Sequence, residues 1–115
     1  MAWETLERLR VYTDESDTID GRSAFSQIVA AAHEHGLAGA TVFRGMMGYG
    51  GNSRIHTARL LELSSDLPVV VEIMDTPERI GSFCAVALGL LKKGLITREP
   101  VMGHRPLKPG ETPGE

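Results

Sequence analysis

The order of the predicted elements constrains this chain most, because one strand–helix–strand pattern occurs twice in succession. Each of the two helices closes with a similar phrase, HGLA at residues 35–38 and KGLI at residues 93–96, which is a weak internal repeat. A β-α-β-β-α-β order is typical of the ferredoxin-like fold of the α+β class. Right-handed crossovers would place both helices on one face of a four-stranded antiparallel sheet with the strand order 4-1-3-2.

Residue type and turn signals locate the elements. Strands are predicted at residues 5–13, 40–47, 67–74 and 95–102; the third is rich in Val and Ile, which predicts a central strand, and the fourth contains a proline, which predicts an edge strand. The first helix is predicted to begin at Asp20 or Ser23 and to end at Gly36. The second begins at Thr76 and ends at Gly94, so that the two lysines before this glycine complement the helix dipole.

Length and composition indicate one small cytoplasmic domain. The chain has 115 residues, of which 1–103 are expected to form the domain and 104–115, rich in Pro and Gly, a disordered or extended tail. A single cysteine fits a reducing compartment, and the sequence shows neither a secretory signal nor an apolar run long enough for membrane insertion. The net charge of −3 argues against nucleic-acid binding.

One face of the predicted sheet combines apolar and charged residues. Alternation along residues 67–74 directs Glu72 away from the helices, and Arg8 and Arg10 on the neighbouring first strand are predicted to share this face with it. Apolar side chains mixed with complementary charges are typical of an oligomer interface. We therefore predict a homo-oligomer in which Arg8, Arg10 and Glu72 lie at the interface.

A glycine-rich, basic run without Asp or Glu at residues 44–59 is the main candidate binding site. Glycine lets backbone N–H groups approach a ligand, and arginine grips phosphate or carboxylate with two parallel hydrogen bonds. Neither a P-loop nor a dinucleotide fingerprint is present. The segment 45–58 is predicted to be a flexible loop that binds a small anion. The candidate ligand-binding residues are Arg44, Gly45, Gly48, Tyr49, Gly50, Gly51, Arg54 and His56.

For two of these residues, a structural role or simple solvation is an alternative to ligand binding. Arg44 either binds an anion or forms a salt bridge with Glu72 or Asp75. His56 contacts a ligand or partner, or is simply solvated.

Catalytic and metal-binding patterns are weak, so we expect no catalytic residue, no metal site and no cofactor. His33 and His35 are two apart on a helix and point to different sides, and the lone Cys84 lies on an apolar helix stripe. The triad residue types Ser53, His56 and Asp66 all sit in or beside one loop, which cannot give a triad its rigid support.

The phrase from Gly36 to Ile80 resembles the family named domain of unknown function 190, within the PII-like signalling proteins. This resemblance implies a ferredoxin-like trimer that binds adenine nucleotides between subunits and has a flexible loop after its second strand. Gly48-Tyr49-Gly50 resembles the start of that loop, and Leu67-Pro68 with Glu72 resembles the PII third strand. Val69 stands where PII proteins have a lysine, and KGLI at 93–96 leaves no room for their phosphate-gripping loop.

The expected function is therefore regulatory. A small anion, with an adenine nucleotide as one candidate, would bind at a cleft of the homotrimer and change the loop, which would signal to a partner such as a transporter or channel. The alternatives are a small enzyme acting on a nucleotide or metabolite in the same cleft and a metal-tolerance trimer of the same fold.

Overall fold

A computed structural model describes residues 3–50, 55–57, 66–106 and 110. It contains two helices and eight strands within this part of the chain. In chain order they are β1 (Glu4–Asp14), β2 (Thr18–Ile19), β3 (Arg22–Ser23), α1 (Ala24–Glu34), β4 (Ala40–Arg44), β5 (Met47–Gly48), β6 (His56–Thr57), β7 (Pro68–Asp75), α2 (Pro77–Leu90) and β8 (Leu95–Gly103).

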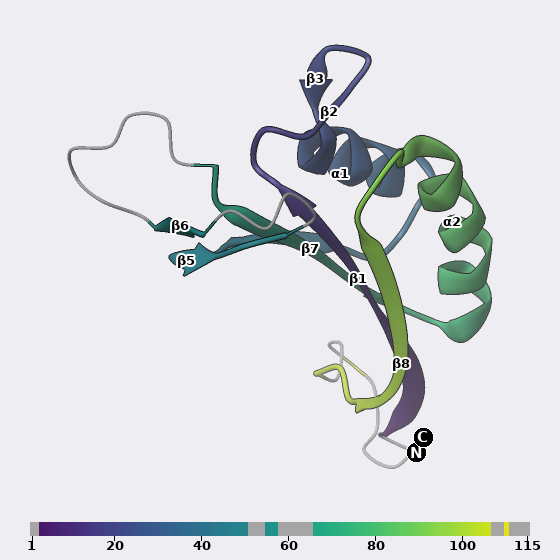
Figure 1. Cartoon of the computed structure of the whole chain (residues 1–115). Helices are drawn as coiled ribbons and strands as arrows, with labels where there is room; N and C mark the ends of the chain where they lie inside the picture. Colours follow the sequence, from purple (N-terminus) through teal and green to yellow (C-terminus); the bar gives the residue numbers. More distant parts are fainter. Residues whose placement is uncertain (1–2, 51–54, 58–65, 107–109, 111–115) are drawn as a thin grey trace.

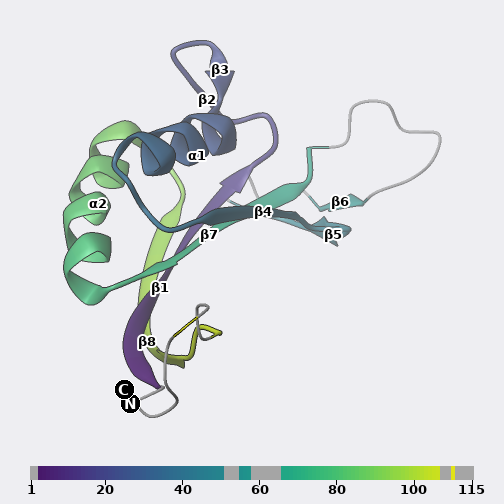
Figure 2. The same cartoon turned by 180° about the vertical axis from the view of Figure 1, so that it is seen from behind.

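The main sheet has four strands in the order β4-β7-β1-β8, and each neighbouring pair is antiparallel. Figures 1 and 2 show both helices on one face of this sheet, which leaves the other face open. The α+β class with two helices on an antiparallel sheet is thus confirmed. As predicted, β7 is central and the proline-containing β8 lies at an edge.

The hydrophobic core lies between the helices and the covered sheet face. Leu9 and Val11 on β1 pack with Ile28 on α1 and with Ile80 and Phe83 on α2, and all five are essentially inaccessible to solvent. Burial alternates along β7, so that every second residue faces the core. The side chains in between remain partly accessible in the single chain, and β7 is buried on only one face.

Two short ladders were not predicted from the sequence. The hairpin β2–β3 turns at Asp20 and Gly21, whose φ angles of 51° and 78° suit a two-residue hairpin turn. Asp20 therefore does not cap α1, which follows Ser23 and ends at Glu34, before Gly36. The second ladder joins β5 to β6, so the predicted strand 40–47 is divided, because β4 already ends at Arg44.

Helix α2 begins as predicted and ends earlier. The Thr76 hydroxyl accepts a hydrogen bond from the Arg79 backbone N–H at 3.3 Å, and Pro77 occupies the first turn. The helix ends at Leu90, so Lys92 and Lys93 lie beyond it and the prediction that these two lysines complement the dipole is wrong. None of the described helices is long and apolar enough to cross a membrane.

Candidate functional site

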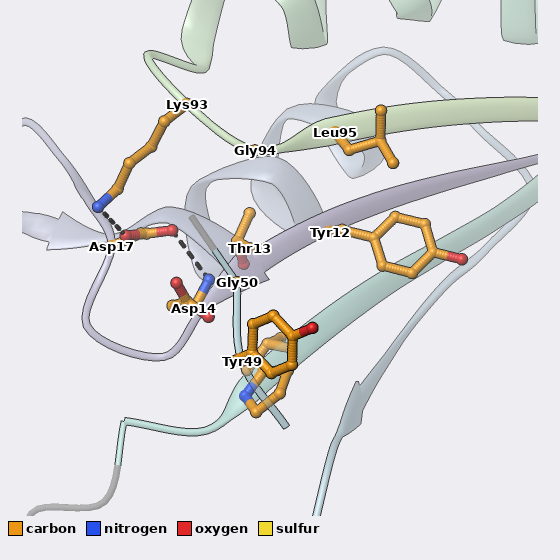
Figure 3. A pocket seen from close by; sticks show the side chains of 11 residues that line it. Tyr12, Thr13, Asp14, Asp17, Tyr49, Gly50, Lys93, Gly94 and Leu95 are labelled. Carbon is orange, nitrogen blue, oxygen red and sulfur yellow. Dashed lines mark hydrogen bonds and ion pairs between the residues drawn. The ribbon is translucent and has the colours of Figure 1, made fainter. Parts of the chain in front are cut away.

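A cavity of about 630 Å³ lies where four segments distant in sequence meet. Figure 3 shows the end of β1, the base of the 45–58 segment and the connection from α2 to β8 around it. Its lining residues are Tyr12, Thr13, Asp14, Asp17, Tyr49, Gly50, Pro68, Val69, Lys93, Gly94 and Leu95. Because strands β1, β7 and β8 supply much of this wall, the sheet positions most of the site.

An ion pair lies at the polar end of the cavity. The Lys93 Nζ lies 2.8 Å from Oδ1 of Asp17, and the backbone N–H of Asp14 donates to Oδ2 of Asp17 at 2.8 Å. Asp17 is buried, whereas the Lys93 side chain is 69 % exposed. The hydrogen bond with Asp17 raises the pKa of the Lys93 ammonium, with the negative charges of Asp17, Asp14 and Asp66 acting in the same direction.

Close backbone approaches shape two walls of the cavity. Gly94 has φ +110°, and a Cβ at this residue would lie 2.5 Å from the carbonyl oxygen of Tyr12. A Cβ on Gly50 would lie 3.0 Å from both carboxylate oxygens of Asp14. Glycine at position 94 thus lets the α2–β8 connection approach the β1 backbone closely, and glycine at position 50 lets the loop base approach the Asp14 carboxylate closely.

The apolar part of the cavity opens towards solvent. Tyr12, Tyr49 and Leu95 all line it and are exposed in the single chain. Aromatic and aliphatic side chains around a few polar groups are the usual composition of a small-molecule site. The arrangement can therefore hold a flat or apolar group against the tyrosines and a polar group near Lys93.

The predicted residues divide between the cavity and its surroundings. Tyr49 and Gly50 line the cavity, and Gly48 pairs with His56 in the β5–β6 ladder. The backbone N–H of Gly45 donates to the Pro68 carbonyl at 2.8 Å. Gly51 and Arg54 lie outside the described residues, so their predicted roles stay predictions.

Arg44 is held outside the cavity. Its guanidinium donates to both carboxylate oxygens of Glu15, at 2.7 and 3.1 Å. The predicted salt bridge with Glu72 or Asp75 is therefore wrong: Arg44 lies across the pairing from Val69, on the opposite sheet face from Glu72. Asp75 instead accepts hydrogen bonds from the backbone N–H groups of Ala38 and Thr76.

Sequence reasoning missed the residues of the polar end, Asp14, Asp17 and Lys93. The two acids are not among the candidate residues, and the lysine was predicted to lie at a helix terminus. The one available signal was Gly94 directly after Lys93, since a glycine that approaches a strand closely brings its neighbour to the end of that strand. Lys93 and Asp17 are 76 positions apart in the sequence, so no local pattern shows their pairing.

The open sheet face carries the predicted charge cluster. Arg10 Nε donates to Glu72 at 3.0 Å, and Arg8 Nε lies 3.8 Å from the same carboxylate. The prediction that these three residues share one face is confirmed. Beside them, cross-strand pairing places four residues in one apolar row over β8, β1, β7 and β4, namely Leu95, Tyr12, Val70 and Phe43. Two of the four, Leu95 and Tyr12, also line the cavity.

The fold is shared with PII-like proteins of known structure. CPII, a nitrogen regulatory PII-like protein from Thiomonas intermedia K12 whose structure is bound to ADP, AMP and bicarbonate, matches 90 % of this chain and 92 % of its own with a TM-score of 0.67 and 12 % identity. The divalent ion tolerance protein CutA1 from Ehrlichia chaffeensis matches 90 % of this chain and 86 % of its own with a TM-score of 0.57 and 10 % identity. At these identities the likeness shows the fold.

The chain belongs to the DUF190 family, described as an uncharacterised ACR, whose model matches residues 6–102. A UPF0166 protein from Aquifex aeolicus (strain VF5) is 43 % identical over 93 residues, which cover 81 % of this chain and 88 % of the relative. The family predicted from the sequence is confirmed.

Proposed function

We propose that this protein is a PII-like regulator that binds a small anionic ligand, with an adenine nucleotide as the leading candidate, in the cavity at the base of the 45–58 segment. The observation that carries the proposal is the cavity itself, where Tyr49 and Gly50 of that segment meet Lys93 of the α2–β8 connection. A ligand there touches both parts at once. CPII, with the same fold, is solved with ADP, AMP and bicarbonate, which supports a nucleotide or a small anion as the class.

The lining offers suitable partners for both ends of a nucleotide. The ammonium of Lys93 is exposed enough to leave Asp17 and meet a phosphate, and a charge-assisted hydrogen bond of this kind is among the stronger polar contacts. Tyr12 and Tyr49 present ring surface to a base, where stacking is worth about 1–3 kcal/mol. Arg54, outside the described residues, remains a proposed further contact to the anion.

We also propose that the cavity is completed in a homotrimer. The apolar row on the open face is exposed in the single chain and runs into the cavity through Tyr12 and Leu95. Covering this row with a second copy would bury the apolar surface and the Arg10–Glu72 pair together, as interfaces do. The neighbouring copy would then close the exposed side of the cavity.

The signal would pass through the 45–58 segment. Gly50 lies on the Asp14 carboxylate and Tyr49 lines the cavity, so a ligand that displaces either residue shifts the start of the segment. A partner protein that binds one conformation of this segment more tightly than another would bind differently to the ligand-bound and ligand-free protein. A transporter or channel is the partner class we propose.

Thermal-shift and calorimetric titration against AMP, ADP, ATP, bicarbonate and phosphate test this function. We expect at least one adenine nucleotide to raise the melting temperature, since a ligand at 100 times its Kd adds about 2.7 kcal/mol per site. Lys93→Gln should reduce the shift, whereas Lys92→Gln, one residue away and outside the cavity lining, should retain it.

Arg44→Ala separates the two candidate anion sites. Loss of the shift in Arg44→Ala with retention in Lys93→Gln would place the ligand at Arg44, as the sequence suggested, and overturn the cavity. No shift with any compound would overturn the proposed function. Chromatography of each nucleotide after incubation with the protein tests the alternative enzyme, because a binding protein returns its ligand unchanged.

A further inference from the structure

We infer that Thr13 and Asp17 recognise the ribose of the ligand, so that the cavity prefers a ribonucleotide to its deoxy analogues. This inference rests on the proposed function, because it adds a specificity to the nucleotide that the same cavity takes. The observation that carries it is a buried hydroxyl without a hydrogen-bond partner, together with a buried carboxylate that can accept further hydrogen bonds. Both belong to the lining of the cavity.

Thr13 has unused hydrogen-bonding capacity. It lies near the end of β1, lines the cavity and is only 7 % exposed, and its Oγ1 has no partner among the described residues. A buried hydroxyl without a partner is unfavourable, because it has given up its hydrogen bonds with water. A threonine hydroxyl can donate one hydrogen bond and accept others. A ligand hydroxyl, which is also both a donor and an acceptor, would therefore satisfy Thr13 in either direction.

Asp17 offers acceptor capacity at the polar end of the cavity. The backbone N–H of Asp14 donates to its Oδ2 at 2.8 Å, and the Lys93 ammonium lies 2.8 Å from its Oδ1. A carboxylate has about four acceptor positions, so these contacts leave room for a ligand hydroxyl. The backbone of Asp17 is fixed, because its N–H donates to the Asp14 carbonyl and its carbonyl accepts from the Ala24 N–H.

The order of the lining groups matches the order of the groups in a nucleotide. Figure 3 shows Thr13 between the Lys93–Asp17 pair and the ring of Tyr12. A phosphate at Lys93 and a base against Tyr12 would therefore bring the ribose that joins them to Thr13 and Asp17. A second cavity of about 320 Å³ shares Thr13, Asp17 and Lys93 with the first. Space on both sides of these side chains gives them room to turn towards a ligand.

A ligand that lacks a ribose hydroxyl would leave these buried groups without a partner. A site that hydrogen-bonds a ligand hydroxyl discriminates against the analogue without it, because its polar groups lose water and gain nothing in return. A ribose that pointed into solvent would give no such difference. We therefore expect ADP to bind at least about tenfold more tightly than the weaker of its 2′-deoxy and 3′-deoxy analogues, a difference of about 1.4 kcal/mol.

Isothermal titration of the full chain in its native assembly tests the inference with ADP, 2′-deoxy-ADP and 3′-deoxy-ADP as probes. Thr13→Val removes the hydroxyl and keeps the branched shape, so it should bring ADP and the weaker analogue towards equal affinity. Thr13→Ser keeps the hydroxyl and should retain the ratio. Asp17→Asn replaces one acceptor oxygen with a donor and should also reduce the ratio. Thr18→Val is the matched control, because Thr18 lines the second cavity and not the first, and the ratio should not change.

Urea unfolding of the ligand-free protein gives a second reading that needs no ligand. Because the Thr13 hydroxyl has no partner in the free chain, Thr13→Val should leave the unfolding midpoint unchanged or raise it. A midpoint clearly below that of the wild type would mean that the hydroxyl is already satisfied, and it would overturn the inference.

The titrations separate failure of this inference from failure of the proposed function. Equal affinity for ADP and both deoxy analogues, with all three weakened by Lys93→Gln, would refute ribose recognition and leave the proposed function standing. A ratio that neither Thr13→Val nor Asp17→Asn alters would refute the assignment to these two residues. Absence of binding by all three probes would remove the proposal of a nucleotide ligand together with this inference.

Discussion

The Nζ of Lys93 lies 2.8 Å from Oδ1 of Asp17, and this contact joins the α2–β8 connection to the turn that follows β1. It closes the polar end of the cavity and links two segments that are 76 residues apart. Asp17 is buried and Lys93 is exposed. Loss of the contact would therefore leave an unpaired buried charge on Asp17, whereas water would still solvate the Lys93 ammonium.

The Lys93–Asp17 contact predicts a stability change at alkaline pH. The pKa of Lys93 is raised above its ordinary 10.5 in the folded chain, so the contact's full contribution is present below pH 10.5 and is lost as pH rises through the folded pKa. Urea unfolding of the wild type and of Lys93→Gln from pH 8 to 12 checks this. The two midpoints should differ at pH 8 and converge above pH 10.5; a constant difference would contradict the prediction.

Substituting Gly94 should destabilise the fold. Gly94→Ala places a Cβ 2.5 Å from the Tyr12 carbonyl oxygen at a φ of +110°, and backbone strain of this kind costs about 1–3 kcal/mol. Gly89→Ala is the matched control, because Gly89 lies in α2 with nothing within 4 Å of its added Cβ and alanine favours a helix by up to about 1 kcal/mol. Urea denaturation should show opposite signs for the two variants.

Asp75 should act as a structural residue of the strand end. Asp75→Ala removes the acceptor for the backbone N–H groups of Ala38 and Thr76 from a position only 3 % exposed. Since a hydrogen bond to a charged group contributes about 1.5–3 kcal/mol, we expect a loss of about 2–4 kcal/mol in the free energy of unfolding. Chemical denaturation measures it, and a loss under about 0.5 kcal/mol, the range of ordinary surface substitutions, would contradict the assignment.

A charge in the apolar row should dissociate the proposed trimer. Phe43→Asp places a carboxylate at the β4 end of the apolar row on a face that assembly would bury, while Phe43 is 51 % exposed in the single chain and contributes little to the core. Light scattering after size exclusion should give a monomer mass for this variant. Leu88→Asp provides the control, because Leu88 is 62 % exposed on α2, on the helix side of the sheet, and this variant should keep the wild-type mass.

A wild-type chain that elutes as a monomer at micromolar concentration would contradict the assembly on which this prediction rests. In that case the apolar row would remain exposed and the cavity would lack its neighbouring copy.

Most helices and strands were predictable because each forms from residue patterns that are local in the sequence. Val69, Val71 and Ile73 alternate with partly accessible residues, and Thr76-Pro77 starts α2 as its residue types require. The hairpin β2–β3 was missed because Asp20 was read as a helix cap, although Asp-Gly is also a turn signal. The predicted end of α2 is four residues late because Gly94 resembles a helix cap, whereas in the structure it allows a close approach to the β1 backbone.

The sequence alone determined the family, the α+β class and the residues that share a sheet face, since these follow from local periodicity and from one long motif. Only the tertiary structure decided which charged groups meet. It placed Arg44 on Glu15, outside the cavity, and brought Lys93 and Asp17 to its polar end. Charge pairing depends on distances of a few ångströms between segments far apart in the chain, and the packing of helices on the sheet sets those distances.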